Sequence, residues 1–389
     1  MDTSPSNRVS DVRRGAPARW LGIVSGEARG LGPTLARAGL ALLAGGYRAG
    51  LAADDLRRRL PGAVRRAPCP VVSVGNLTVG GTGKTPMVAY LANLVVGEGY
   101  CPLIVSRGYG AEAGAVNEEA RELADRCPDV PHVQDPDRLR AIRAHAATHP
   151  CDVAILDDGF QHRRLARDLD IVLLDALRPF GYGHLLPRGL LREPPSALRR
   201  ADVVVVTRAD LADPAALARV KESAARYAAP GTPVLTAAHR PAGLVFADGS
   251  REPAEWLAGR SVAAACAIGN PGALGRTLER LGARLVRLAA FRDHHAYTAE
   301  DLSRLSDAAR EAGAVALVTT GKDFVKWRPL LGQGSGQAPG TARAAGADGE
   351  ARAPAVAALE VTLHLTDGED TLRRRVLGLV APPRRGGDR

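Results

Sequence analysis

A glycine-rich loop between a buried strand and a helix restricts the folds open to this chain. Residues 71–96 read VVSVGNLTVGGTGKTPMVAYLANLVV, an apolar run followed by a loop and then by the apolar spacing of a helix. The loop almost matches GxxxxGK[ST], a pattern that cradles phosphate groups, but Thr78 stands where the first glycine is expected. Because such a loop follows a strand and opens a helix, we expect an α/β fold with a parallel sheet.

Strands and helices alternate along most of the chain. Near-continuous apolar runs, typical of parallel strands buried on both faces, occur at 71–74, 103–106, 153–156, 171–174 and 203–207. Helical spacing is found over 86–96 and 137–148. A second series predicts strands at 261–268, 284–288, 315–319 and 356–365, with helices at 271–281, 299–311 and 367–380. Each series predicts an α/β domain.

The length of 389 residues suits two domains of ordinary size. We expect a loose tail and an apolar helix over 1–60, a phosphate-loop core over 61–235 and a C-terminal α/β domain over 236–389. Residues 233–250 read as two extended segments with a turn that connect the domains. Residues 332–354 are rich in glycine and alanine without apolar periodicity, so we predict a disordered surface insertion.

Composition limits the kinds of partner. The formal net charge is +10, and arginine supplies 48 of the 52 basic residues, a bias that accompanies abundant alanine, glycine and proline. Aromatic residues make up only 4% of the chain, too few for base-stacking platforms, and no nucleic-acid motif occurs. We therefore expect no nucleic acid partner, whereas phosphate or an anionic membrane surface suits the charge. Five scattered cysteines without metal-ligand spacing predict reduced, mostly buried thiols in a cytoplasmic protein.

The N-terminal region contains one short apolar run and no clean signal peptide. Residues 38–47, AGLALLAGGY, lie between Arg37 and Arg48. A helix that crosses a bilayer needs about 20 apolar residues, so this run is too short to span one. Two interpretations stay open: a helix that lies in a membrane interface with its arginines at the headgroups, and a helix that packs on the domain.

The loop residues suit a nucleotide. Backbone N–H groups at Gly80, Gly81 and Gly83 can converge on phosphate oxygens, Lys84 can reach the terminal phosphates, and the Thr85 hydroxyl can bind Mg²⁺. The alternative is a glycine-rich turn without a ligand. We expect the nucleotide to bind residues Thr78, Val79, Gly80, Gly81, Thr82, Gly83, Lys84 and Thr85.

A pair of carboxylates ends the strand predicted at 153–156. Asp157 and Asp158 begin DDGFQH, and in parallel sheets ligands bind beyond the carboxyl ends of the strands, where the phosphate loop also lies. Carboxylates beside phosphates can hold Mg²⁺ directly or through water. The alternative is a pair of aspartates that cap a helix. Gln161 and His162 extend the polar patch.

Several motifs together resemble the tetraacyldisaccharide 4'-kinases, also called lipid A 4'-kinases. DDGFQH after VGGTGKTP is the most specific combination, and the motifs follow the family's order from about residue 65 to 330. They are SVGNLTVGGTGKTP, VSRGYG, LDDGFQHRRL, LLPRGLLREP, VTRAD, IGNPGALGRTLERLG, FRDHHAYTAEDL and VTTGKDFVKW. In this family a threonine or similar residue usually replaces the first glycine of the loop, as Thr78 does here.

The resemblance implies an activity, a fold and a place in the cell. It implies ATP- and Mg²⁺-dependent phosphorylation of the 4'-hydroxyl of a tetraacyldisaccharide 1-phosphate, the lipid A disaccharide precursor. It implies two α/β/α domains, one a P-loop NTPase-like core and the other smaller, joined by a short two-stranded linker, with a cleft between them and an N-terminal membrane-contacting helix. It places the protein peripherally on the cytoplasmic face of the inner membrane, without an obligate protein partner.

The resemblance also implies site residues. Glu118 aligns best with the family's acidic base, with Glu119 as the alternative, and His294 of FRDHHAY pairs with it; without the resemblance, DHH also suits a turn that precedes a helix. We assign catalytic roles to Glu118, His294, Lys84 and Asp158. We assign metal binding to Thr85, Asp157 and Glu193. We assign substrate binding to Asn76, Arg107, Tyr109, Gln161, His162 and Arg192. VTRAD is left without a role.

Two other functions remain as alternatives. One is a different small-molecule enzyme with a phosphate loop, such as a dethiobiotin-synthetase-like protein, although DDGFQH and the second α/β domain argue against it. The other is a nucleotide-switch ATPase that docks to membranes through the N-terminal helix. A switch hydrolyses ATP without an acceptor, whereas a kinase depends on one.

Overall fold

Two compact units make up the structure. The computed structural model describes residues 9–11, 16–58, 60, 62–108, 118–268, 271–292, 295–331 and 353–380. Trp20–His239 with Leu363–Arg389 form one unit, here called the phosphate-loop unit, and Met1–Arg19 with Arg240–Thr362 form the second unit. The boundaries of these two units differ from the domain boundaries expected from the sequence. The expected domain boundaries therefore stay a prediction.

The phosphate-loop unit is built on a parallel sheet with strand order β8-β7-β6-β2-β5-β3-β4. The strands are β2 Val71–Asn76, β3 Pro102–Ser106, β4 His132–Gln134, β5 Val153–Asp157, β6 Leu169–Asp175, β7 Val203–Thr207 and β8 Val234–Phe246. Every residue of β2, β3, β5 and β7 is buried, which explains their near-continuous apolar sequence. The five strands predicted for this part of the chain are confirmed.

Helices cover both faces of this sheet. On one face, α3, α4 and α10 pack in a single apolar core with Val72, Val74 and Ile155; on the other, α5, η2 and α6 pack on further strand residues. The bounds are α1 Ala16–Ser25, α2 Leu31–Arg57, α3 Lys84–Gly97, α4 Glu118–Arg126, α5 Arg138–Ala146, η1 Gly181–Gly183, η2 Pro195–Arg200, η3 Ala209–Leu211, α6 Pro214–Tyr227 and α10 Glu369–Leu377. The side chains of Asp137 and Asp213 accept hydrogen bonds from the first turns of α5 and α6 and so fix where these helices begin.

The second unit repeats the layered architecture. Its strand order is β1-β11-β10-β12-β13-β8, and β9 pairs antiparallel with β8. Helix α7 packs on one face, while α8 and α9 pack on the other. The bounds are β1 Val9–Asp11, β9 Arg251–Glu252, η4 Ala254–Leu257, β10 Ser261–Cys266, α7 Pro271–Arg280, β11 Arg284–Ala290, α8 Ala299–Glu311, β12 Ala316–Thr320, α9 Gly321–Leu331 and β13 Ala355–Asp367.

Two segments differ from the sequence prediction. A loose tail was expected at the N-terminus, but Val9–Asp11 form a strand parallel to β11. Residues 233–250 were expected as two extended segments with a turn, but Val234–Phe246 form one strand, β8, which passes from one unit to the other after His239. The expected disordered insertion at 332–354 falls almost entirely outside the described residues.

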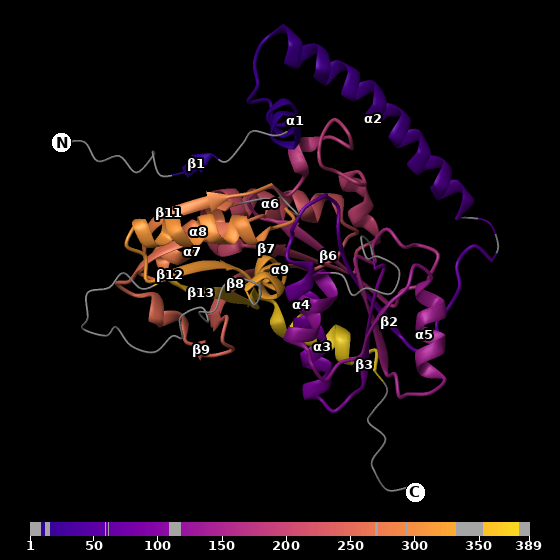
Figure 1. Ribbon diagram of the computed structural model, residues 1–389. Helices are drawn as coiled ribbons and strands as arrows, with labels where there is room; N and C mark the ends of the chain where they lie inside the picture. The colour runs from indigo at the N-terminus through magenta and orange to yellow at the C-terminus, as the bar shows by residue number, and fades with distance from the viewer. Residues whose placement is uncertain are drawn as a thin grey trace, which may run out of the picture. The chain divides into compact units, whose positions relative to one another are not determined.

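Helix α2 is the longest helix of the phosphate-loop unit (Figure 1). None of its 27 residues is buried, and its strongly exposed apolar side chains include Leu31, Leu35, Leu42 and Leu43. Over the ranges that the structure describes, no helix has both the length and the apolar character needed to cross a membrane.

Candidate active site

The loop after β2 has the backbone of an anion-binding turn. Gly80 and Gly83 have φ angles of 113° and 88°, a left-handed region that glycine enters without strain. Gly83 is the N-cap of α3 and Lys84 is its first residue. The N–H groups of this first helical turn and the positive end of the helix dipole favour a phosphate here. Gly83 is also closely packed, since a Cβ atom there would lie 2.7 Å from Nε2 of His239.

Thr78 occupies its position in the loop without strain. Its backbone is not left-handed, so the fold does not require glycine there. Thr78 forms an antiparallel bridge with Leu191, and the N–H of Val79 donates to the carbonyl of Leu190 at 2.8 Å. A Cβ atom on Gly181 would lie 3.0 Å from Cγ2 of Thr78. The threonine methyl group therefore fills space that Gly181 leaves open, and the departure from GxxxxGK[ST] has a structural cause.

Two residues of the VTRAD motif fasten the loop. The hydroxyl of Thr207, the last residue of β7, donates to the carbonyl of Thr82 at 2.9 Å. The guanidinium of Arg208 donates to the carbonyl of Gly81 at 2.7 Å, and it also forms an ion pair with Asp175 at the end of β6. These contacts direct loop carbonyl groups toward β7, which leaves loop N–H groups for an anion.

Asp158, directly after β5, has two charged partners, Arg192 and Lys84. Arg192 binds it through two hydrogen bonds, from Nη1 to Oδ2 at 2.8 Å and from Nη2 to Oδ1 at 2.7 Å. Nζ of Lys84 lies 3.6 Å from Oδ1 of Asp158 and 3.5 Å from Oδ1 of Asn76. Burial raises the pKa of Asp158, but the hydrogen bonds from Arg192 and the charge of Lys84 outweigh it, so the pKa lies well below its usual range. Asp158 is therefore ionised at neutral pH.

Glycines allow this carboxylate to approach the loop. Asp158 has a φ of 53°, an uncommon conformation for a residue other than glycine. A Cβ atom on Gly159 would lie 2.8 Å from Oγ of Ser73, and one on Gly75 would lie 2.4 Å from Cβ of Phe160. The segment that starts at Asp158 can lie against β2 only because both positions lack side chains.

The expected magnesium ligands are hard oxygen donors, and they lie at the edge of the sheet where the strands end and the phosphate loop begins. Asp157 ends β5 with 2% of its surface exposed, and Thr85 lies in the first turn of α3. A carboxylate and a hydroxyl suit Mg²⁺, which in phosphate-transfer sites needs only one or two protein ligands beside phosphate and water. Across the described ranges, no three His, Cys, Asp or Glu side chains are arranged to hold a metal. The donor set fits a metal that is shared with a nucleotide.

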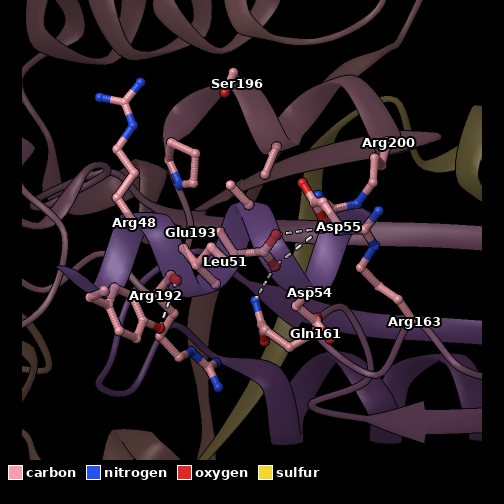
Figure 2. Close-up of a pocket in the computed structure, with 14 residues that line it drawn as sticks. Arg48, Leu51, Asp54, Asp55, Gln161, Arg163, Arg192, Glu193, Ser196 and Arg200 are labelled. Carbon is pink, nitrogen blue, oxygen red and sulfur yellow. Dashed lines mark hydrogen bonds and ion pairs between the residues drawn. The ribbon is translucent and has the colours of Figure 1, made fainter. Parts of the chain in front are cut away.

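Glu193, the third expected metal ligand, is engaged by other side chains. Both of its carboxylate oxygens accept hydrogen bonds from Arg200, at 3.1 Å and 2.9 Å. The amide of Gln161 donates to Glu193 at 3.1 Å and to the backbone carbonyl of Asn76 at 2.9 Å. Figure 2 shows Glu193 held in this way between Gln161 and the arginine. The metal-binding role of Glu193 stays a prediction.

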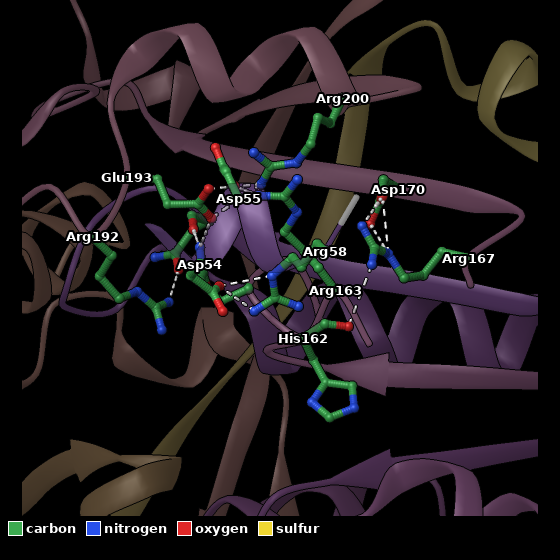
Figure 3. Close-up of polar contacts among 12 residues, drawn as sticks. Asp54, Asp55, Arg58, His162, Arg163, Arg167, Asp170, Arg192, Glu193 and Arg200 are labelled. Atoms are coloured by element: carbon green, nitrogen blue, oxygen red, sulfur yellow. Dashed lines mark hydrogen bonds and ion pairs between the residues drawn. The ribbon is translucent and has the colours of Figure 1, made fainter. Parts of the chain in front are cut away.

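A pocket of about 430 Å³, lined by charged and apolar side chains, opens between α2 and the segment 192–200. Tyr47 of α2 lines it and donates from its hydroxyl to the carbonyl of Arg192 at 2.9 Å. Ion pairs join Asp55 of α2 to Arg163, and Asp54 to Arg58 (Figure 3). The pocket is thus rimmed by charges of both signs and adjoins, through Arg192, the cluster around Asp158.

His162 and Arg107 lie at the carboxyl ends of β5 and β3. Burial, with the charges of Arg138 and Arg167, lowers the pKa of His162 to about 4, so its ring is neutral at pH 7. Nη1 of Arg138 lies 3.4 Å from Nδ1 of this histidine. Arg107 directly follows β3, is exposed, and lowers the pKa of Arg138, after the larger effect of burial. Positive charge from Arg138 and Arg167 therefore acts on His162 at this edge of the sheet.

Comparison with known proteins identifies the family. A family model described as tetraacyldisaccharide-1-P 4'-kinase matches residues 37–336. The chain belongs to the tetraacyldisaccharide-1-P 4'-kinase family. A tetraacyldisaccharide 4'-kinase of Syntrophus aciditrophicus is 43% identical over 68% of this chain and 77% of the relative, and one of Anaeromyxobacter sp. is 39% identical over 92% and 93%. The crystal structure of LpxK from Aquifex aeolicus in complex with ATP matches 89% of this chain and 99% of that chain, with a TM-score of 0.65 and 28% identity.

Membership of the 4'-kinase family confirms the resemblance drawn from the motifs, and with it a kinase with a mostly parallel α/β fold. The proposed base and its partner are not placed. Glu118 and Glu119 begin α4, but their side chains lie outside the described part, as do His294 and Tyr109. Their roles in this 4'-kinase stay predictions.

The neighbour of His294 has a structural environment. Nε2 of His295 lies 3.1 Å from Oδ2 of Asp301 in α8, and its ring stacks on Phe291. Thr298 is the N-cap of α8 and forms a reciprocal capping box with Asp301. The helix start that the sequence suggested as an alternative context for DHH is therefore present after His295, while Asp293 and His294 lie outside the described residues.

Several residues of this 4'-kinase site were missed by the sequence analysis. Arg208 and Thr207 donate hydrogen bonds to carbonyl groups of the phosphate loop. Arg200 donates to the carboxylate of Glu193, and Tyr47 of α2 donates to the backbone carbonyl of Arg192. Only VTRAD offered a signal, because it directly follows a strand and so ends at the ligand-binding edge of the sheet.

Proposed function

We propose that this chain transfers the γ-phosphoryl group of ATP to the 4'-hydroxyl of a tetraacyldisaccharide 1-phosphate, a step of lipid A biosynthesis. The observation that carries the proposal is the cluster of Lys84, Asp158, Arg192 and Asn76 beside the phosphate loop, in a member of the tetraacyldisaccharide-1-P 4'-kinase family. Phosphoryl transfer requires positioned phosphates and neutralised charge, which this arrangement supplies.

ATP is assigned to the loop 78–85. The contacts of Lys84 at 3.5 Å and 3.6 Å are long, so its ammonium group can turn to a phosphate without breaking a strong hydrogen bond. Arg208 and Thr207 keep the loop in shape. The assignment is supported by the left-handed Gly80 and Gly83, whose conformations open the backbone toward an anion.

Mg²⁺ is assigned to Thr85 and Asp157, with Glu193 as the further candidate. When bound, the metal would neutralise charge that builds up on the phosphates. Arg192 keeps Asp158 ionised and fixed beside the lysine, so Asp158 orients Lys84 and Arg192 toward the transferred group. We therefore assign metal binding to Asp157 and the positioning of Lys84 and Arg192 to Asp158. The ion pairs of Asp158 with Arg192 and Lys84 support this assignment.

The acceptor is assigned to the polar side of the site. Asn76, Arg107, Tyr109, Gln161, His162 and Arg192 are the proposed sugar- and phosphate-binding residues. The pocket beside Gln161 and Arg192, about 430 Å³ in volume, offers hydrogen-bond donors and acceptors to a disaccharide. Glu118 is the proposed base that removes the 4'-hydroxyl proton, and His294 is proposed to orient it and hold charge.

The lipid substrate implies a membrane surface. Helix α2 exposes Leu31, Leu35 and Leu42 at a spacing of four and then seven residues, which places them along one helix face. With no residue of α2 buried, the interpretation as an interfacial helix is favoured over a packed one. We propose peripheral binding at the cytoplasmic face of the inner membrane, without a protein partner.

The test is phosphate transfer with and without the acceptor. The full chain is incubated with radiolabelled ATP, Mg²⁺ and tetraacyldisaccharide 1-phosphate in detergent, and the lipid product is analysed for a 4'-phosphate. We expect ATP consumption to depend on the acceptor and the label to appear at the 4' position. Acceptor-independent hydrolysis would instead support a switch ATPase, and transfer to another position would contradict the proposed acceptor.

A further inference from the structure

Three cysteines lie at the amino ends of three neighbouring strands, at the sheet edge opposite the phosphate loop. Cys69 precedes β2 by two residues, Cys151 precedes β5 by two residues, and Cys101 directly precedes β3. These strands are adjacent, in the order β2-β5-β3. All three thiols are free. They belong to the phosphate-loop unit and have no part in the proposed kinase site.

Two of these thiols are in contact. Sγ of Cys69 lies 3.3 Å from Sγ of Cys151, and both residues are half-buried, so small reagents can reach them. A disulfide requires sulfur atoms about 2.05 Å apart and Cα atoms about 4.4–6.8 Å apart. Neighbouring strands lie about 4.8 Å apart, and the register of Val71 with Ala154 offsets Cys69 from Cys151 by one residue, about 3.3 Å along the strand, so Cα atoms at these positions are separated by about 5.8 Å, inside that range. Rotation of the two side chains can therefore close the bond while the strands stay in place.

The backbone on each side of the pair is fixed. The N–H of Ala154 donates to the carbonyl of Pro70 at 2.9 Å, and Val71 pairs with Ala154 in the parallel ladder. The carboxylate of Asp168 accepts from the N–H of Val71 at 2.8 Å. These bonds keep the two thiols facing each other and reduce the conformational entropy lost when they join.

The two thiols differ chemically. The contact with Cys151, the largest influence, lowers the pKa of Cys69, whereas the same contact raises the pKa of Cys151. The thiolate is the reactive form of cysteine. Cys69 is therefore assigned as the side chain that attacks an electrophile, and Cys151, whose Sγ lies 3.3 Å away, is placed to react with the product.

We propose that Cys69 and Cys151 are a dithiol modification site that hydrogen peroxide oxidises to a disulfide. The Cys69 thiolate attacks one peroxide oxygen, the O–O bond breaks, and the departing hydroxide takes a proton to become water. The resulting sulfenic acid is attacked by Cys151, whose thiol proton leaves with the sulfenic oxygen as a second water while the S–S bond forms. Two thiols lose two electrons in total, and one peroxide is reduced to two waters.

The bond would join the amino ends of β2 and β5 and enclose the phosphate loop, β3, α4 and α5 in one covalent ring. Closing so long a loop restricts the unfolded chain and stabilises the folded one. Because the bond forms at the opposite edge from Lys84 and Asp158, nucleotide binding should persist. Oxidation therefore yields a more stable protein that still binds ATP.

The experiment maps the bond in the full chain. The reduced protein is treated with hydrogen peroxide, free thiols are counted after denaturation in the presence of an alkylating reagent, and peptides are analysed by mass spectrometry. We expect two of the five thiols to disappear, a peptide that links Cys69 to Cys151, and a rise in the melting temperature that dithiothreitol reverses. A link between Cys101 and Cys151, or the absence of a link at peroxide concentrations that oxidise Cys101, would overturn the proposal.

Variants separate the pair from general thiol chemistry. Cys101→Ser, which alters the exposed neighbour, should leave the disulfide and the rise in melting temperature intact, whereas Cys69→Ser should abolish both. Phenylarsine oxide bridges paired thiols, so it offers a second readout that needs no oxidation: wild type and Cys101→Ser should bind one equivalent, and Cys69→Ser should lose at least tenfold in affinity. Equal arsenical binding by wild type and Cys69→Ser would also contradict the paired site.

Discussion

Arg192 forms two parallel hydrogen bonds to the carboxylate of Asp158, from Nη1 to Oδ2 at 2.8 Å and from Nη2 to Oδ1 at 2.7 Å. The same guanidinium also donates to the side chain of Asn76, so one side chain connects the acidic end of β5 to the end of β2. Lys84 contacts both of these partners. The site is therefore organised around the pairing of Arg192 with Asp158 as much as around the phosphate loop.

Arg192→Lys should impair turnover far more than folding. Lysine keeps the positive charge but cannot make two parallel hydrogen bonds to one carboxylate. Loss of a charged hydrogen bond costs roughly 1.5–3 kcal/mol, so we expect kcat/KM to fall about 10- to 100-fold, with little change in melting temperature. The matched control is Arg199→Lys, which alters an exposed arginine of η2. An unchanged kcat/KM in Arg192→Lys would show that the paired geometry is dispensable.

Gly83→Ala should weaken ATP binding by a steric mechanism. The new Cβ atom would lie 2.7 Å from Nε2 of His239, at a residue whose φ is 88°. A left-handed alanine costs about 1–2 kcal/mol, and the clash adds to this. We expect the Kd for ATP, measured by calorimetry, to rise at least tenfold, whereas Gly97→Ala at the other end of α3 has open space around it and should bind normally.

A double variant distinguishes the clash from backbone strain. His239→Ala removes the ring that a residue at position 83 would meet, so Gly83→Ala with His239→Ala should recover part of the lost affinity. Gly80→Ala carries only strain, because a Cβ there meets nothing within 4 Å. If the double variant binds ATP no better than Gly83→Ala, the loss arises from strain alone.

Local sequence signals were sufficient to predict the strand at 71–74, the phosphate loop that follows it, and the position of Asp157 and Asp158 at the end of a neighbouring strand. Lys84 and Asp158 were expected at one edge of a parallel sheet, and the structure brings them within 3.6 Å. Arg208 was missed because its contact with Gly81 joins positions 127 residues apart, and no local pattern encodes such a distance. Arg192 was expected to bind substrate, which stays a prediction; its carboxylate partner in the structure depends on the left-handed turn at Asp158, which sequence alone did not reveal.

Short secondary-structure elements and contacts between distant segments were also not predicted from the sequence. Three residues, Val9–Asp11, form β1 by pairing with β11; a strand so short has too few positions to display a period. The fit of Thr78 beside Gly181 depends on a segment about a hundred residues away. Family resemblance supplied the expectation of a threonine there, whereas the packing supplies its reason.

Stability should fall as the pH drops below 6.5, and His132 should account for part of the loss. Burial lowers the pKa of His132 to about 4, below the value of about 6.5 for an unfolded chain. Between these values the unfolded state binds more protons, so acid favours unfolding, by up to about 2 kcal/mol at pH 5 for this residue. His162 and His239, with pKa values lowered to about 4 and about 3, act in the same direction.

The check is the difference in melting temperature between pH 7 and pH 5. It should be smaller in His132→Gln than in wild type, because glutamine does not titrate, while His149→Gln, at an exposed position, should behave as wild type. A difference in His132→Gln that equals that of wild type would mean that His132 takes up its proton equally in both states.

Membrane binding should depend on the leucine face of α2. Leu35 and Leu42 are 71% and 81% exposed and lie seven residues apart on one helix face. Burying a leucine contributes about 1.5–3 kcal/mol, so replacing both by serine should lower binding to phosphatidylglycerol vesicles at least tenfold in a sedimentation assay. Val315→Ser removes an exposed apolar side chain of the second unit and serves as the control. Equal sedimentation of the double variant and wild type would exclude this face of α2 as the membrane contact and would leave the basic surface as the source of any binding.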